Sequence, residues 1–117
     1  MPIIALTDAT FVDEVKKPGL IFIDFWASWC APCRAFAPIF EKVAAKHPDV
    51  RFAKVDTDKA RAVADALSIR SIPTLMVIRE GEVIFAQPGA MGERPLEGLV
   101  RWAKEDAKLP AANAQAR

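Results

Sequence analysis

The stretch LIFIDFWASWCAPCR, residues 20–34, decides the fold because two different periodicities meet in it. Its first seven residues, Leu20 to Trp26, are apolar except for one aspartate and rich in β-branched and aromatic side chains. A short continuous apolar run of this kind is typical of a central strand buried on both faces of a sheet. From Cys30 to about Lys46 apolar side chains recur at helical spacing, so the stretch predicts a buried strand followed directly by a helix.

Outward from this stretch, predicted strands and helices alternate along the chain. The sequence predicts further strands over 3–6, 50–56, 74–78 and 83–86, and further helices over about 8–15, 60–67 and 95–103. Thr7 or Asp8 is the expected N-cap of the first helix, and a hairpin turn is expected at 79–82. The order β-α-β-α-β-α-β-β-α predicts one α/β domain over residues 1–109, followed by a frayed, Ala-rich tail over 110–117.

Composition and charge exclude several classes of protein. The 117 residues carry 16 basic and 15 acidic side chains, and this net charge of +1 gives no electrostatic reason to expect nucleic acid or an anionic membrane as partner. The longest apolar run, residues 20–29, is interrupted by Asp24 and is too short to span a bilayer. Residues 1–5 lack the basic and apolar regions of a secretory signal, so we expect a cytoplasmic protein. We also expect a monomer.

The two cysteines, Cys30 and Cys33, carry the predicted chemistry. Three residues apart in the first helical turn, they lie at neighbouring positions, close enough to form a disulfide. Cys30 also meets the unpaired N–H groups and the positive dipole end of the helix, which favour the thiolate, the nucleophilic form. We predict that Cys30 is the exposed nucleophile and that Cys33, one turn deeper, resolves the mixed disulfide. Pro32 restricts the turn between them.

Two other interpretations of this pair need weighing. Buried cysteines are common as small apolar residues, and zinc half-sites use the same spacing. Zinc would need two more ligands, whereas the sequence has no third cysteine and a single histidine, His47, which we interpret as a helix-end residue. We therefore expect no metal.

The segment 25–34, followed by Pro38, closely resembles the active-site segment of the thioredoxin family. The resemblance continues through 53–56, 71–75, 81–83 and 88–90, and it covers roughly residues 3–107. It implies the thioredoxin fold, a central mixed sheet of four to five strands flanked by helices on both faces. It also implies general reduction of disulfides in protein substrates, electron transport and redox homeostasis. No cofactor is expected beyond the Cys30–Cys33 disulfide, which thioredoxin reductase would return to the dithiol.

Several single residues also match the family. Asp24 matches a buried aspartate that transfers protons behind the inner cysteine, and burial in an apolar strand should raise its pKa. Lys54 matches the charge neighbour of that aspartate, although a solvated lysine on an alternating strand is a competing interpretation. Pro73 matches a cis-proline facing the cysteines, next to backbone groups of Ile72 that would pair with an extended substrate segment.

An apolar collar around the first cysteine is the expected substrate-binding surface. Its members are Trp29, Ala31, Pro32, Ile72, Pro73, Gly89 and Ala90. The sequence departs from the family at Ala31, where glycine is usual, and at Pro88, which removes a backbone donor beside the collar. Two rival functions remain open at this stage: a reductant dedicated to one pathway, and a binding module whose cysteines are incidental.

Overall fold

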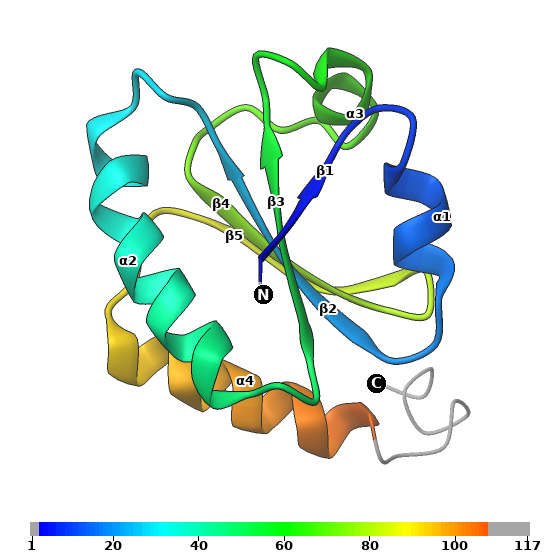
Figure 1. The fold of residues 1–117 in the computed structure, drawn as a ribbon, viewed down its shortest axis with the longest axis vertical. Helices are drawn as coiled ribbons and strands as arrows, with labels where there is room; N and C mark the ends of the chain where they lie inside the picture. The colour runs from blue at the N-terminus through cyan, green and yellow to red at the C-terminus, as the bar shows by residue number, and fades with distance from the viewer. Residues whose placement is uncertain (1–2, 108–117) are drawn as a thin grey trace.

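The apolar stretch that opens residues 20–34 forms the middle strand of the sheet (Figure 1). A computed structural model describes residues 3–107, and its sheet has the order β1-β3-β2-β4-β5. The strands are β1 (Ile3–Leu6), β2 (Leu20–Trp26), β3 (Arg51–Asp56), β4 (Thr74–Arg79) and β5 (Glu82–Pro88). β3 pairs in parallel with both β1 and β2, whereas β4 pairs antiparallel with β2 and β5. The sheet is therefore mixed, as expected.

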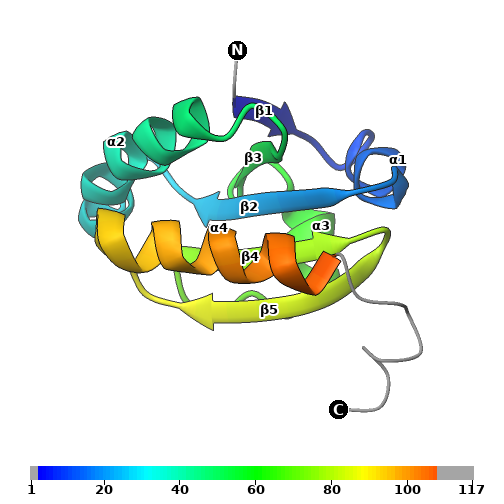
Figure 2. The same cartoon turned by 90° about the horizontal axis from the view of Figure 1, so that it is seen from below.

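Helices cover both faces of this sheet. The helices are α1 (Phe11–Lys16), α2 (Ala31–Lys46), α3 (Arg61–Ala66) and α4 (Glu93–Ala107). α2 and α4 pack on one face, and α1 and α3 on the other; Figure 2 shows α4 in front of the strands. The expected α/β architecture and order of elements are confirmed.

Side chains of β2 alternate between the two cores, because successive residues of a strand point to opposite faces. Phe22 belongs to the core under α2 and α4, and it stacks on Phe52 of β3 with ring centroids 5.1 Å apart. Phe40 of α2 meets Phe52 edge-on at 5.3 Å. Ile21 and Ile23 point into the other core. Burial on both faces explains why this strand is almost wholly apolar.

The hairpin between β4 and β5 turns through two residues with positive φ. Glu80 has a φ of 52° and Gly81 a φ of 87°, the combination of a tight type I′ turn. β5 continues to Pro88, beyond the predicted end at residue 86, because Pro88 still pairs with Thr74. Pro88 ends an edge strand, where its missing N–H costs no ladder hydrogen bond.

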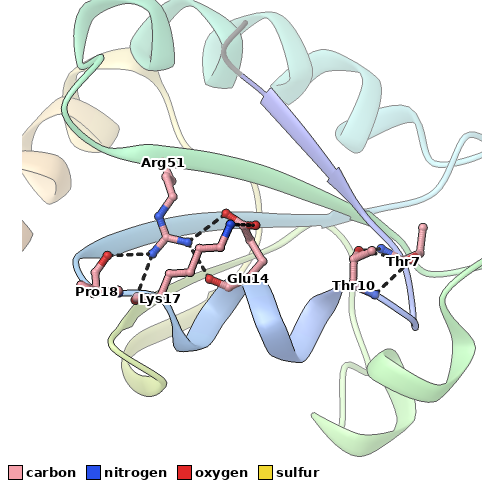
Figure 3. Close-up of polar contacts among 6 residues, drawn as sticks. All are labelled: Thr7, Thr10, Glu14, Lys17, Pro18 and Arg51. Atoms are coloured by element: carbon pink, nitrogen blue, oxygen red, sulfur yellow. Dashed lines mark hydrogen bonds and ion pairs between the residues drawn. The ribbon is translucent and has the colours of Figure 1, made fainter.

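The prediction that Thr7 or Asp8 caps the first helix is wrong for Asp8 and partly confirmed for Thr7. Oγ1 of Thr7 accepts the N–H of Thr10 at 3.3 Å and its carbonyl accepts that of Phe11 at 3.0 Å, although the helix itself begins only after Thr10. Thr10 is the N-cap of α1, after a turn in which the backbone N–H of Thr7 donates to Oγ1 of Thr10 at 3.0 Å (Figure 3). Asp8 instead caps α3, since its carboxylate accepts the N–H of Val63 at 2.9 Å and that of Ala62 at 3.4 Å. A side chain 55 residues away in sequence thus satisfies the open donors of a helix.

Arg51 of β3 closes the other end of α1. Its guanidinium donates to the carbonyl of Glu14 at 2.6 Å and to the carbonyls of Lys17 and Pro18 at 3.3 Å (Figure 3). It also pairs with the Glu14 carboxylate at 3.1 Å. These contacts satisfy carbonyls that a six-residue helix leaves open, and they tie the segment before β2 to the sheet.

Two further sequence predictions concern the C-terminal tail and membrane-spanning segments. The tail expected over 110–117 lies outside the described residues. Within residues 3–107, no helix has both the length and the apolar character needed to cross a membrane.

Candidate active site

The two cysteines lie where β2 gives way to α2. Cys30 is the N-cap of α2, Cys33 lies in its first turn, and the two form a disulfide with their Cα atoms 5.2 Å apart. The backbone N–H of Cys33 donates to Sγ of Cys30 at 3.2 Å. Pro32 occupies the first turn, where a proline removes no intrahelical hydrogen bond. The N–H donor and the helix N-terminus both stabilise negative charge on Sγ of Cys30.

Cys30 is less accessible than the sequence analysis predicts. Its exposed fraction is 5%, against 1% for Cys33. Cys30 is thus the more accessible of the two, as expected, but it is buried and not exposed. The reason is a segment distant in sequence: the carbonyl oxygen of Ile72 lies 3.7 Å from Sγ of Cys30. The outer sulfur is therefore almost completely buried in the oxidised protein.

The segment covering that sulfur starts β4. The Ile72–Pro73 peptide bond is cis, and the carbonyl of Pro73 accepts the N–H of Gly89 at 2.8 Å. Gly89 has a φ of 102°, a conformation that side chains disfavour. The residues of the expected collar differ in exposure: Trp29, Ala31, Pro32, Gly89 and Ala90 are exposed, Ile72 is half-buried and Pro73 is buried. Pro73 therefore offers a bound substrate little surface, in contrast to the exposed members of the collar.

Trp29 is the largest exposed part of the collar. Two-thirds of its surface is open to solvent, with an exposed fraction of 67%. Its indole N–H donates to a carboxylate oxygen of Asp58 at 2.9 Å, and the backbone N–H of Asp58 donates to Asp56 at 2.9 Å. Asp58 is a site residue that the sequence analysis missed. It follows β3 in an exposed turn, where an aspartate gives no local signal of a partner 29 residues away.

Asp24 is buried in the middle strand, β2. Its exposed fraction is 2%, and its Oδ1 has no hydrogen-bond partner among the described residues. By strand alternation its side chain shares a face with Phe22, and this is the face that α2 covers. Burial raises the pKa of Asp24 to about 7, and the positive charge of Lys54 partly opposes this effect. A carboxyl group with this pKa exchanges its proton near neutral pH.

Lys54 lies beside Asp24 in the sheet, because the two are paired in the register of β2 and β3. Its ammonium lies 4.5 Å from the centroid of the Trp26 ring, a cation–π contact. It also borders a hollow of about 300 Å³. Of the two interpretations of Lys54, the geometry favours the charge neighbour over a fully solvated lysine.

His47 lies away from this site, at the C-terminal end of α2. Its Nε2 contacts Glu97 of α4 at 2.6 Å, and its Nδ1 lies 2.9 Å from the ammonium of Lys104. It therefore joins two helices, as a helix-end residue does. Within residues 3–107, no group of three or more histidine, cysteine, aspartate or glutamate side chains is arranged to hold a metal ion.

Comparison with known proteins agrees with this geometry. The family model for thioredoxin matches residues 2–105. A putative thioredoxin 2 of Streptomyces coelicolor is 44% identical over 87% of this chain and 76% of its own length. Thioredoxin 1 of Synechococcus elongatus is 43% identical over 79% of this chain and 88% of its own. Thioredoxin of Bacillus subtilis is 36% identical over 86% and 96%. With its close cysteine pair, the chain belongs to the thioredoxin family of thiol–disulfide oxidoreductases.

Proposed function

We propose that this protein is a general reductant of disulfides in protein substrates, with Cys30 as nucleophile and Cys33 as resolving residue. The observation that supports this most is the position of Cys30. It is the N-cap of a sixteen-residue helix, with a backbone N–H 3.2 Å from its sulfur and a second cysteine in bonding range. These features stabilise a thiolate and supply the partner that completes the exchange.

The reaction has two steps. In the first, the Cys30 thiolate attacks one sulfur of the substrate disulfide, a Cys30–substrate disulfide forms, and the other substrate sulfur leaves as a thiolate. In the second, Cys33 loses its proton and attacks Sγ of Cys30, releasing the second substrate thiolate. The substrate gains two electrons and the protein ends with its Cys30–Cys33 disulfide.

Asp24 is the proposed proton acceptor for Cys33 in the second step. The raised pKa, about 7, allows it to be ionised in part of the population and to hold the proton when neutral. Lys54 tunes this balance, because its charge favours the ionised carboxylate. Both groups lie on the side of the sheet that α2 covers.

The collar is the proposed binding surface for the substrate chain. The half-buried Ile72 offers its backbone beside Sγ of Cys30, and an extended segment pairing there would bring its own sulfur close to Sγ of Cys30. The exposed ring of Trp29, fixed by Asp58, forms the opposite wall. Ala31 in place of the family's usual glycine keeps the helix start less flexible without removing any of these contacts.

The proposal includes partners and location. Return to the dithiol requires a two-electron donor, for which a thioredoxin reductase is the expected protein, and no bound cofactor is required. We propose a cytoplasmic monomer that contributes to electron transport and redox homeostasis. The alternatives, a reductant for one pathway or a binding module with incidental cysteines, have no specific observation in their favour.

Reduction of insulin disulfides tests the assignment. The wild type should catalyse the reduction with a dithiol donor, whereas Cys30→Ser should be inactive. Cys33→Ser should accumulate mixed disulfides on Cys30, and the number of different captured proteins shows how general the reductant is. Ser28→Ala, an exposed neighbour of the pair, is the control and should retain activity. Normal activity of Cys30→Ser would contradict the proposal.

A further inference from the structure

A second hollow lies beside the collar, and the proposed reaction does not use it. Its volume is about 240 Å³, several times the ~30 Å³ that one water molecule occupies in the liquid. It is lined by the connection between α3 and β4 and by the carboxyl end of β5. Apolar side chains, among them Leu67, Ile69 and Met76, form much of its lining.

Several residues that line this hollow are chain neighbours of the collar. Ser71 and Thr74, which line it, flank the Ile72–Pro73 pair, and Pro88, which also lines it, precedes Gly89. The rim shared with the collar is held together, since the hydroxyl of Thr74 donates to the carbonyl of Ser71 at 2.5 Å. A protein segment bound along the collar would therefore lie close to this hollow.

The electrostatics of the hollow indicate which side chains would fit. Arg70 is the single charged residue of the lining. It is exposed, and within residues 3–107 its guanidinium has no ion pair or side-chain hydrogen bond. A planar guanidinium without a partner at the edge of an apolar recess is suited to bind a carboxylate.

Only a few residues of a bound substrate would separate its attacked cysteine from a side chain at the hollow. A substrate cysteine attacked by Cys30 lies close to the carbonyl of Ile72, which is 3.7 Å from Sγ of Cys30. An extended segment advances by about 3.3 Å per residue, and alternate side chains point to the same side. A side chain two or three residues from the attacked cysteine is thus displaced by about 7–10 Å along the bound segment, a span long enough to pass Ser71, the chain neighbour of Ile72.

We propose that this hollow is a side-chain subsite that selects protein substrates with an apolar residue and an adjacent carboxylate near the attacked cysteine. The apolar side chain occupies the hollow beside Met76, and the carboxylate pairs with Arg70. The inference rests on the proposed function, because it uses the collar as the binding surface for the substrate chain.

The test uses short peptides whose single cysteine is disulfide-bonded to thionitrobenzoate. Attack of the Cys30 thiolate on the peptide sulfur forms the mixed disulfide and releases coloured thionitrobenzoate, the better leaving group. The peptides are identical except at the positions two and three residues from the cysteine. At these positions, before and after the cysteine, they carry Leu-Glu, Leu-Lys or Ser-Glu. The symmetrical small disulfide of thionitrobenzoate, which has no peptide chain, measures the exchange chemistry alone.

Wild-type protein should react about threefold faster with the Leu-Glu peptide than with the Leu-Lys peptide, the range of an exposed ion pair. Arg70→Glu should reverse this preference, and high salt should shrink it. Ala86→Leu, which fills the hollow, should abolish the preference for Leu-Glu over Ser-Glu. Arg101→Glu and Ala45→Leu make the same changes at exposed positions of α4 and α2 and should behave as wild type.

Two failures are distinguishable. Equal rates for all peptides, or an equal change in Arg101→Glu and Arg70→Glu, would overturn the subsite while the small disulfide still reacts normally. Failure of wild type to react with the small disulfide would overturn the proposed function, and with it the subsite.

Discussion

Replacing Asp24 by asparagine should stabilise the folded protein, by an amount that grows with pH. The wild-type carboxyl is buried, and burial raises its pKa from 3.8 to about 7. An acid whose pKa is raised by folding costs nothing while both states are protonated. It destabilises the fold progressively as the pH rises, because the unfolded chain ionises first. Asparagine has nearly the same shape and never ionises, so it removes this cost.

The magnitude follows from the two pKa values. Each tenfold difference in proton affinity is worth about 1.4 kcal/mol, so the full cost above pH 7 is about 4 kcal/mol. At pH 5 the unfolded carboxyl is ionised and the folded one is not, and the cost is already about 1.5–2 kcal/mol. Between pH 5 and pH 9 the wild type should therefore lose about 2–3 kcal/mol relative to Asp24→Asn.

Urea unfolding of the oxidised proteins at a series of pH values measures this difference. Asp13→Asn, which removes an exposed carboxylate on α1, is the matched control and should differ from wild type by less than about 0.5 kcal/mol throughout. A difference between wild type and Asp24→Asn that stays constant from pH 5 to pH 9 would refute the argument that desolvation sets the pKa of this carboxyl.

Three further outcomes are expected. Lys54→Met removes the charge that lowers the pKa of Asp24, so the pH at which half the Asp24-dependent stability is lost should rise; an unchanged midpoint in the same urea series would count against this coupling. Arg51→Met should destabilise the fold by about 1–2 kcal/mol in urea, since it leaves carbonyls at the end of α1 without their charged donor. Asp58→Ala frees the indole of Trp29 and should reduce kcat/KM about two- to tenfold for insulin, from the cost of ordering one side chain. The small thionitrobenzoate disulfide should react unchanged, and equal losses on both substrates would contradict the positioning role of Asp58.

The sequence was sufficient to predict the order of elements because each carries its own periodicity. β2 is recognisable from seven nearly continuous apolar residues, and α2 from apolar side chains at helical spacing on the C-terminal side of Cys30. The close cysteine pair follows from spacing within one turn. The raised pKa of Asp24 follows from its place in an apolar strand, which already implies burial.

What the sequence could not predict depends on residues that are distant along the chain. The Asp8 carboxylate accepts N–H groups at the start of α3 and not of α1, because the loop after β1 lies beside a helix that begins more than 50 residues further on. Cys30 is less exposed than expected because the segment at Ile72 folds over its sulfur. The hydrogen bond between Trp29 and Asp58 likewise joins residues that are distant along the chain. Each depends on how the strands are paired, and local patterns do not encode that pairing.

The central claim is that the N-terminus of α2 holds the sulfur of Cys30 as a thiolate near neutral pH. Alkylation of the reduced protein by iodoacetamide across the pH range, with each modified cysteine identified by mass spectrometry, measures this directly. Cys30 should react ahead of Cys33, and its reactivity should be half-maximal at least one pH unit below the value of about 8.5 for a free thiol. Two sulfurs that both titrate like a free thiol would contradict it.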